Sequence, residues 1–190
     1  MAPRVRRTAG GGKRVRTAAA NLTTLLGQLH GTNKNKLAAL KRLHEILMRG
    51  VGNGTEYEAI LAAGAAVADN VVPMLEAHAV KYLKLPAAKV IYLTLRGEHG
   101  LEEMSDETTH PILGRATLVA QALIKVLNQE LTKGAQANAE LVHLAIAALD
   151  ELTRAHSSVH AVAEAGAIVP CVELCGSSAC TATLECATKI

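Results

Sequence analysis

The chain has 190 residues, of which 49% are hydrophobic and only 2% aromatic, with three Tyr and neither Trp nor Phe. A core of Ala, Leu, Val and Ile favours closely packed helices over a sheet, because strands are enriched in aromatic and β-branched residues. The longest uncharged apolar run, residues 59–68, is well short of the roughly twenty residues that span a bilayer, so we expect no transmembrane segment.

Positive charge gathers at the N-terminal end, which the net charge of +3 conceals. The first acidic residue is Glu45, so residues 1–44 carry half of the 20 Lys and Arg and none of the 17 acids. Residues 1–17 have too little apolar content to fold and predict a disordered basic arm. An anionic partner would suit the cations of this arm, which are Arg4, Arg6, Arg7, Lys13, Arg14 and Arg16.

The composition of the arm fits three interpretations. It can be a solvated tail, an organellar transit peptide that is short of Ser, or a nuclear-localisation or nucleic-acid segment that contacts phosphates rather than bases. We therefore expect a cytoplasmic or nuclear protein, with an organellar location as the alternative. The phrase GGGK is not a phosphate-binding loop, because it lacks the first spaced Gly, a Ser or Thr after Lys13 and a preceding strand.

Helical periodicity begins after the arm. Residues 18–30 place four leucines on one helix face, and Thr32 or Asn33 can cap a second helix over residues 36–49. The Gly-rich segment 50–54 that follows predicts a break.

The middle of the chain predicts a group of three helices. EYEAILAAG forms a short helix, residues 66–77 with Pro73 form the next, and residues 86–96 form the third, after a less regular segment 78–85. The acidic stretch 97–109 predicts a loop longer than a helical repeat needs, and such insertions often carry binding.

Two further helices precede the C-terminal region. Residues 114–130 predict the first. The second runs from Ala139 through Arg154, and its apolar residues cover most of the helix surface. One narrow polar strip is left, which consists of His143, Ala147, Asp150, Glu151 and Arg154.

The C-terminal region predicts a short helix, a medium helix and a long one. Ser157 and Ser158 are cap-type residues for the short helix, and Gly166 can end it in the left-handed conformation. Pro170 then lies in the first turn of the medium helix, where its missing N–H costs nothing. The last helix ends at Ile190 with an apolar face uncovered, so we expect the chain to continue, or this end to pair with another chain or with itself.

The phrase VAEAGAIVPCVEL resembles the armadillo repeat, in which a short helix, an EAG turn and a helix opening A-I-P-x-L-V-x-L precede a long third helix. The turns at Gly64 and Gly166 are separated by about two units of 40 to 50 residues. The resemblance implies an all-α fold, a right-handed α-solenoid of about three repeats plus an N-terminal helix or two. Its domain would cover residues 18–190, with units 18–49, 55–97, 110–155 and 156–190.

A weaker resemblance concerns the phrases KLAALKRLHEILMRG and KVIYLTL, which are similar to the opening of the adaptin trunk, another α-solenoid. This similarity implies a vesicle-coat or trafficking component as an alternative function.

The armadillo resemblance implies a non-catalytic scaffold that binds a protein or peptide along the groove of its third helices. The positions that hold Trp and Asn in nuclear-import receptors include Val90 and Thr94 here, and none of the matching positions retains either residue. The expected groove is therefore one of mixed charge. Its residues are Lys41, Glu45, His143, Ala147, Glu151, Arg154, Glu185 and Lys189.

Reactive chemistry has little support in the sequence. The cysteines Cys171, Cys175, Cys180 and Cys186 lack the C-x2-C spacing of zinc sites and fit packing positions. His156 and His160 are four residues apart, but no acidic or Cys ligand is placed near them in sequence. We expect neither a metal nor a cofactor, and an enzyme without a recognisable motif is the remaining alternative.

Overall fold

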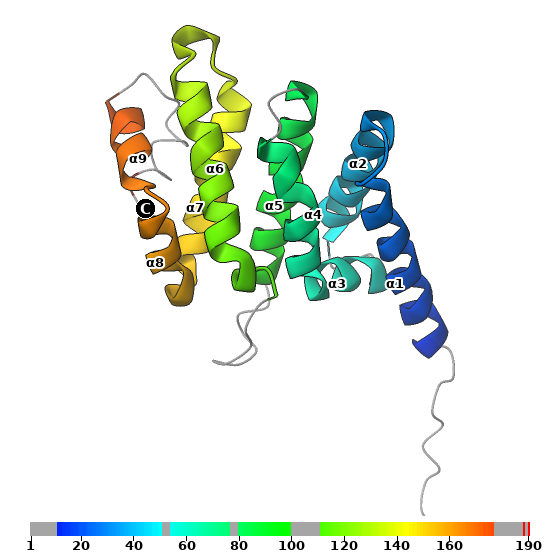
Figure 1. Ribbon diagram of the computed structural model, residues 1–190. Coiled ribbons are helices and arrows are strands. Elements are labelled where there is room, and N and C mark those ends of the chain that lie inside the picture. Colours follow the sequence, from blue (N-terminus) through cyan, green and yellow to red (C-terminus); the bar gives the residue numbers. More distant parts are fainter. Residues whose placement is uncertain (1–10, 51–53, 77–79, 100–110, 177–187, 189) are drawn as a thin grey trace, which may run out of the picture.

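The computed structural model describes residues 11–50, 54–76, 80–99, 111–176, 188 and 190, and all regular secondary structure within them is helical (Figure 1). The predicted all-α class is confirmed. The helices are α1 (Gly11–Gln28), α2 (Asn33–Arg49), α3 (Thr55–Ala62), α4 (Gly64–Glu76), α5 (Lys81–His99), α6 (Ala116–Leu131), α7 (Ala139–Arg154), α8 (His156–Glu164) and α9 (Ile168–Cys175). Short 3₁₀ turns lie at Leu113–Arg115 and Gly134–Gln136.

Helix α1 begins before the predicted position. The arm was expected to stay disordered through residue 17, but the helix begins at Gly11. Lys and Arg are good helix formers, and a helix that nucleates in the Ala-rich stretch after Thr17 can propagate through them. The first ten residues of the predicted arm lie outside the described part of the chain.

Several helix ends follow the predicted chemistry. Thr32 is the N-cap of α2, and its side chain accepts a hydrogen bond from the backbone N–H of Asn35. Asn138, for which no cap was predicted, caps α7 in the same way by accepting from the N–H of Leu141 at 3.1 Å. Gly166 has a φ of +87° between α8 and α9, the left-handed conformation that was predicted.

Other predicted ends are wrong. Ser158 is buried inside α8, whose N-cap is Ala155, so neither serine caps this helix. Helix α5 begins at Lys81 and contains Pro86, so the proline does not start a new helix. Pro86 removes the helical hydrogen bond to the carbonyl of Tyr82, but the first turn of α5 still packs on the core through the buried Leu83.

The predicted acidic loop also begins later than expected, because α5 continues to His99. Gly97 lies in this added turn, where a Cβ would lie 2.6 Å from the Tyr57 hydroxyl of α3. Glycine thus lets α5 pass close to α3 without interrupting either helix. Residues 100–110 of the predicted loop lie outside the described chain.

The helices are arranged in two layers and in sequence order, from α1 on the right of Figure 1 to α9 on the left. In one layer α2 packs on α5 and α5 on α7. In the other layer α4 packs on α6, and α6 on both α8 and α9. The layers are joined by the contacts of α5 with α4 and of α7 with α6 and α8. One continuous apolar core runs between them, with fully buried side chains that include Leu43, Leu75, Ile91, Leu123 and Ile146.

Two helix pairs bend at nearly the same angle. Helix α3 meets α4 at 75°, and residues Ser158–Glu164 of α8 meet α9 at 76°. Each pair thus joins a short helix to its successor at nearly the same angle. Within the described residues, no single helix is long and apolar enough to cross a membrane. Each of the two bent pairs passes that test only when its two helices are combined.

Candidate partner-binding surfaces

The residues expected to line a groove fall into three groups. Lys41 and Glu45 are exposed on α2, and Arg154 is exposed and His143 half-buried on α7. The groove positions that the armadillo resemblance places near the centres of α5 and α7 are buried. Their side chains are at most 6% exposed, and they are Val90, Thr94, Ala147 and Glu151. Glu185 and Lys189 lie outside the described residues.

Arg154 explains how two acidic residues of α7 are accommodated in the interior. Its guanidinium lies 3.2 Å from the carboxylate of Asp150 and 3.6 Å from that of Glu151. The arginine head stays in contact with solvent while both carboxylates are buried beside it. The predicted polar strip of α7 is therefore largely an internal ion cluster, and only its two ends reach the surface.

The accessible side of α5 differs in register from the expected one. Its residues are spaced three and four apart and comprise Tyr82, Leu85, Lys89, Tyr92 and Arg96. Tyr82 is 56% exposed, Arg96 is exposed, and the other three are half-buried. The expected Val90 is one position away from Lys89, which turns a side chain by about 100° around a helix. The burial of Val90, Ile91, Thr94 and Leu95 is the signal that identifies this face.

Lys89 connects three helices on this side of the molecule. Its ammonium lies 2.7 Å from the carboxylate of Glu140 on α7. On α2, burial and then the charge of Lys89 lower the pKa of His44, against an opposing effect of Glu45. We call this surface the α2–α5–α7 face and define it by Lys41, His44, Glu45, Met48, Tyr82, Leu85, Lys89, Tyr92, Arg96, Glu140, His143 and Arg154.

Arg96 and Tyr92 form an ordered pair on the α2–α5–α7 face. The Arg96 Nη1 donates a hydrogen bond to the Tyr92 hydroxyl at 3.3 Å, and the guanidinium carbon lies 6.0 Å from the ring centroid. A cation at this distance from an aromatic ring is attracted by the ring quadrupole. These two contacts join the side chains of Arg96 and Tyr92 on the face.

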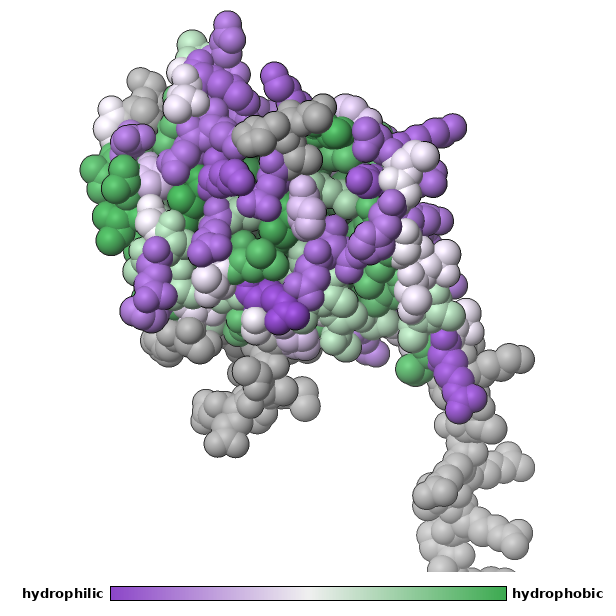
Figure 2. All heavy atoms as spheres, viewed as in Figure 1, coloured by the Kyte–Doolittle hydropathy of each residue, from purple (hydrophilic) through white to green (hydrophobic). Residues whose placement is uncertain are grey.

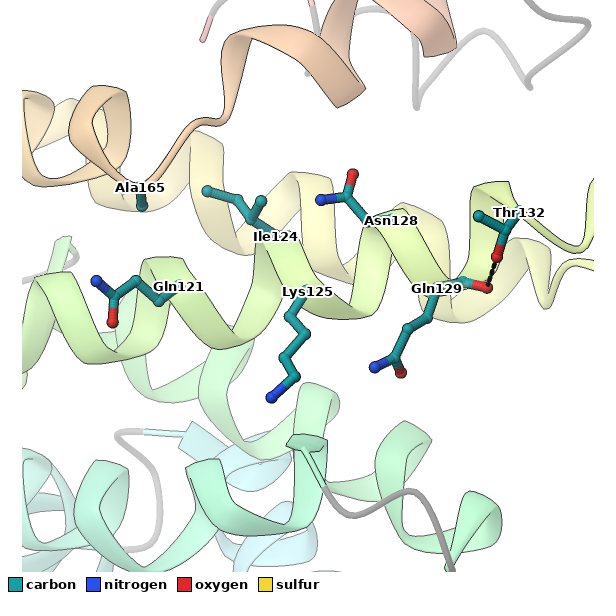
Figure 3. A pocket seen from close by; sticks show the side chains of 7 residues that line it. All are labelled: Gln121, Ile124, Lys125, Asn128, Gln129, Thr132 and Ala165. Atoms are coloured by element: carbon teal, nitrogen blue, oxygen red, sulfur yellow. Dashed lines mark hydrogen bonds between the residues drawn. The ribbon is translucent and has the colours of Figure 1, made fainter.

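The opposite layer carries a hollow of about 450 Å³ along α6 (Figure 3). Gln121, Lys125 and Gln129 project from one side of the helix, and Asn128 lies on the other side of the same hollow. Lys125 forms an ion pair with Glu76 of α4 at 3.2 Å. Figure 2 shows a largely hydrophilic surface over the upper part of α6.

A second hollow, of about 380 Å³, lies where α6 ends and α7 begins, against the start of α5. It shares Gln129 and Thr132 with the first hollow. Its other lining residues are Lys81, Lys84, Glu130, Lys133, Gln136, Asn138 and Leu141. We call it the lysine pocket.

An apolar patch occupies the exposed side of α9. Ile168, Val169 and Val172 are 62%, 64% and 65% exposed and form the hydrophobic group at the left edge of Figure 2. Such a patch is a frequent site of protein contact. The last predicted helix was expected to leave an apolar face uncovered at Ile190. Most of that helix lies outside the described residues.

The groups that could support chemistry are few in the described part of the chain. No set of three His, Cys, Asp or Glu side chains is close enough there to hold a metal ion. Burial raises the pKa of the Cys171 thiol to about 11, with a further contribution from Cys175, so its thiolate is scarce at neutral pH. His160 lies 3.0 Å from Glu164 on the exposed side of α8.

Comparison of the chain with protein-family models, with curated proteins and with solved structures found no match. The armadillo and adaptin resemblances therefore rest on the quoted sequence phrases alone, and the geometry of the surfaces has to carry any functional conclusion.

Proposed function

We propose that this protein is a non-catalytic interaction module that binds a protein or peptide segment across the α2–α5–α7 face. The proposal includes the architecture that the armadillo resemblance implies, a right-handed solenoid in which α2, α5 and α7 act as the long third helices. The order of the helices in two layers and the matching bends of α3–α4 and α8–α9 support this architecture.

The distribution of aromatic residues carries the proposal. The chain has three tyrosines and neither Phe nor Trp. Tyr57 is buried, whereas Tyr82 and Tyr92 both lie on the accessible side of α5. Tyr, Met and Arg are enriched at protein interfaces, and Tyr and Arg are also enriched among the residues that dominate binding energy. Two tyrosines, Arg96 and the exposed Met48 on one face are therefore typical of a partner-binding surface.

The charges of the face indicate which partners it can accept. Lys41, Lys89 and Arg96 alternate with Glu45 and Glu140 over adjacent helices. A mixed pattern of this kind favours a partner with both signs of charge and an apolar or aromatic centre, rather than a uniformly acidic or basic segment. Packing on neighbouring helices keeps the face rigid, which lowers the entropy cost of binding.

Two exposed anchors provide the test. The variant Tyr82→Ala/Arg96→Ala removes them without opening the core, so helix content and unfolding temperature should stay unchanged. The matched control His160→Ala/Glu164→Ala truncates an exposed ion pair on α8, away from the face. Partners captured by the wild-type protein should be lost by the first variant and kept by the second. Equal retention by both variants would remove the α2–α5–α7 face from the proposal.

A further inference from the structure

The lysine pocket has an excess of positive charge. The start of α5 contributes Lys81 and Lys84, and the turn after α6 contributes Lys133. Among the described residues that line the pocket, Glu130 is the one carboxylate. Three ammonium groups thus share a hollow with a single acid, and the charge of Lys125 reaches Lys84 as well.

Glu130 is already engaged by other groups. Its side chain is 4% exposed, and one oxygen accepts a hydrogen bond from the backbone N–H of Asn138 at 2.9 Å. The other oxygen pairs with the ammonium of Lys133. Burial alone would raise the pKa of Glu130, but these two contacts and Lys84 lower it below its ordinary value. The carboxylate therefore stays ionised and holds the turn between α6 and α7.

Lys84 is the unusual member of the cluster. It is 6% exposed, and its ammonium donates to the neutral side-chain oxygen of Gln129 at 2.6 Å. Within the described chain, no carboxylate lies within ion-pair distance of this ammonium. Burial lowers the pKa of Lys84, and Lys133, Lys125 and Lys81 lower it further, against the opposing effect of Glu130. A buried cation beside other cations is costly unless an anion joins them.

We propose that the lysine pocket binds a phosphate group, held by Lys81, Lys84 and Lys133 with polar support from Gln136 and Thr132. A phosphate monoester carries a charge of about −1.5 to −2 at neutral pH, which matches the excess of the pocket. A carboxylate would neutralise only half of that excess. The volume of about 380 Å³ leaves room for part of the molecule that carries the phosphate.

The site does not depend on the α2–α5–α7 face. The variant Tyr82→Ala/Arg96→Ala should leave phosphate binding unchanged, so failure of one proposal can be separated from failure of the other. Phosphate could come from a small metabolite or from a phosphorylated side chain of a bound segment, and both sources present the same chemistry to the pocket.

The test is a titration of the full chain at constant ionic strength with four compounds: inorganic phosphate, O-phosphoserine, a phosphoserine pentapeptide and acetate. Calorimetry measures the binding, and thermal unfolding measures the stabilisation. We expect the phosphate compounds to bind, to raise the unfolding temperature with concentration, and to exceed acetate by at least tenfold in affinity. Tighter binding of the pentapeptide than of inorganic phosphate would assign a phosphorylated segment, and equal binding would assign a free metabolite.

Variants decide whether this pocket is responsible. Lys84→Met keeps an unbranched apolar side chain of nearly the same length and should weaken phosphate binding by about tenfold or more, because one charge-assisted hydrogen bond is lost. Lys34→Met, on the exposed start of α2, should have no effect. Glu130→Gln increases the positive excess and should tighten binding. If Lys84→Met does not fold, the more exposed Lys133→Met should show the same weakening. Equal effects of Lys34→Met and Lys84→Met, or equal binding of acetate and phosphate, would overturn the proposal.

Discussion

Replacing Glu130 by Gln tests the most specific electrostatic feature of the fold. Gln keeps the size of the side chain and one acceptor oxygen, but it removes the charge that faces Asn138 N–H and Lys133. A hydrogen bond to a charged group contributes about 1.5–3 kcal/mol and a neutral one about 0.5–1.5 kcal/mol. The pair with the partly exposed Lys133 adds up to about 1 kcal/mol. We therefore expect a loss of about 2 kcal/mol in the free energy of unfolding.

Urea denaturation and thermal unfolding followed by circular dichroism measure this loss. In a chain of this length, about 2 kcal/mol corresponds to a decrease of roughly 4–8 °C in the unfolding temperature. Glu45→Gln is the matched control, because Glu45 is exposed and pairs with the partly exposed Arg42 at 3.2 Å. That variant should stay within about 0.5 kcal/mol of the wild type.

The pH dependence of the Glu130→Gln effect has a definite sign. The folded pKa of Glu130 lies below the ordinary value of 4.5, so its ionised form stabilises the fold above that pH. This stabilisation is lost as the pH falls through the lowered pKa, and protonated Glu then resembles Gln. The stability gap should thus be full at neutral pH and should shrink progressively below pH 4.5. A gap of zero at neutral pH, or one that stays constant into acid, would refute the reasoning.

Three further predictions concern packing and reactivity. Gly97→Ala should destabilise the fold by about 1–3 kcal/mol because its Cβ meets Tyr57, whereas Gly27→Ala, in an uncrowded position of α1, should stabilise it by up to about 1 kcal/mol in the same unfolding assay. Ser158→Ala should leave the unfolding free energy equal or slightly higher, since its buried hydroxyl has no hydrogen-bond partner in the described structure; a loss above about 1 kcal/mol would show a missing partner. At pH 8 a thiol reagent should modify the exposed Cys175 before Cys171, as peptide mapping by mass spectrometry would reveal, and the reverse order would contradict the burial of Cys171.

Local chemistry made several elements predictable from the sequence. Thr32 starts α2, Gly166 separates α8 from α9, and α7 covers the expected residues, because each depends on a cap, a left-handed glycine or a dense apolar period. The starts of α1 and α5 were harder to predict from the sequence. Basic residues form a helix as readily as a solvated arm. A proline usually marks the first turn of a helix, but packing of the buried Leu83 and Lys84 extends α5 ahead of Pro86.

The surfaces were harder to predict than the helices. The register of α5 depends on which neighbours cover Val90 and Thr94, and a repeat pattern carried over to this helix misplaces the accessible side by one residue. The lysine pocket combines the start of α5 with the end of α6, which are far apart in the sequence. Only the packing of the two layers brings Lys84 beside Gln129 and Lys133, so no local sequence motif predicts the lysine pocket.

Partner capture with matched variants tests the proposed function most directly. We predict that the wild-type protein and His160→Ala/Glu164→Ala retain the same bound protein, and that Tyr82→Ala/Arg96→Ala loses it while keeping its helix content and unfolding temperature. Retention of that protein by a folded Tyr82→Ala/Arg96→Ala variant would contradict the assignment of the α2–α5–α7 face as the binding surface.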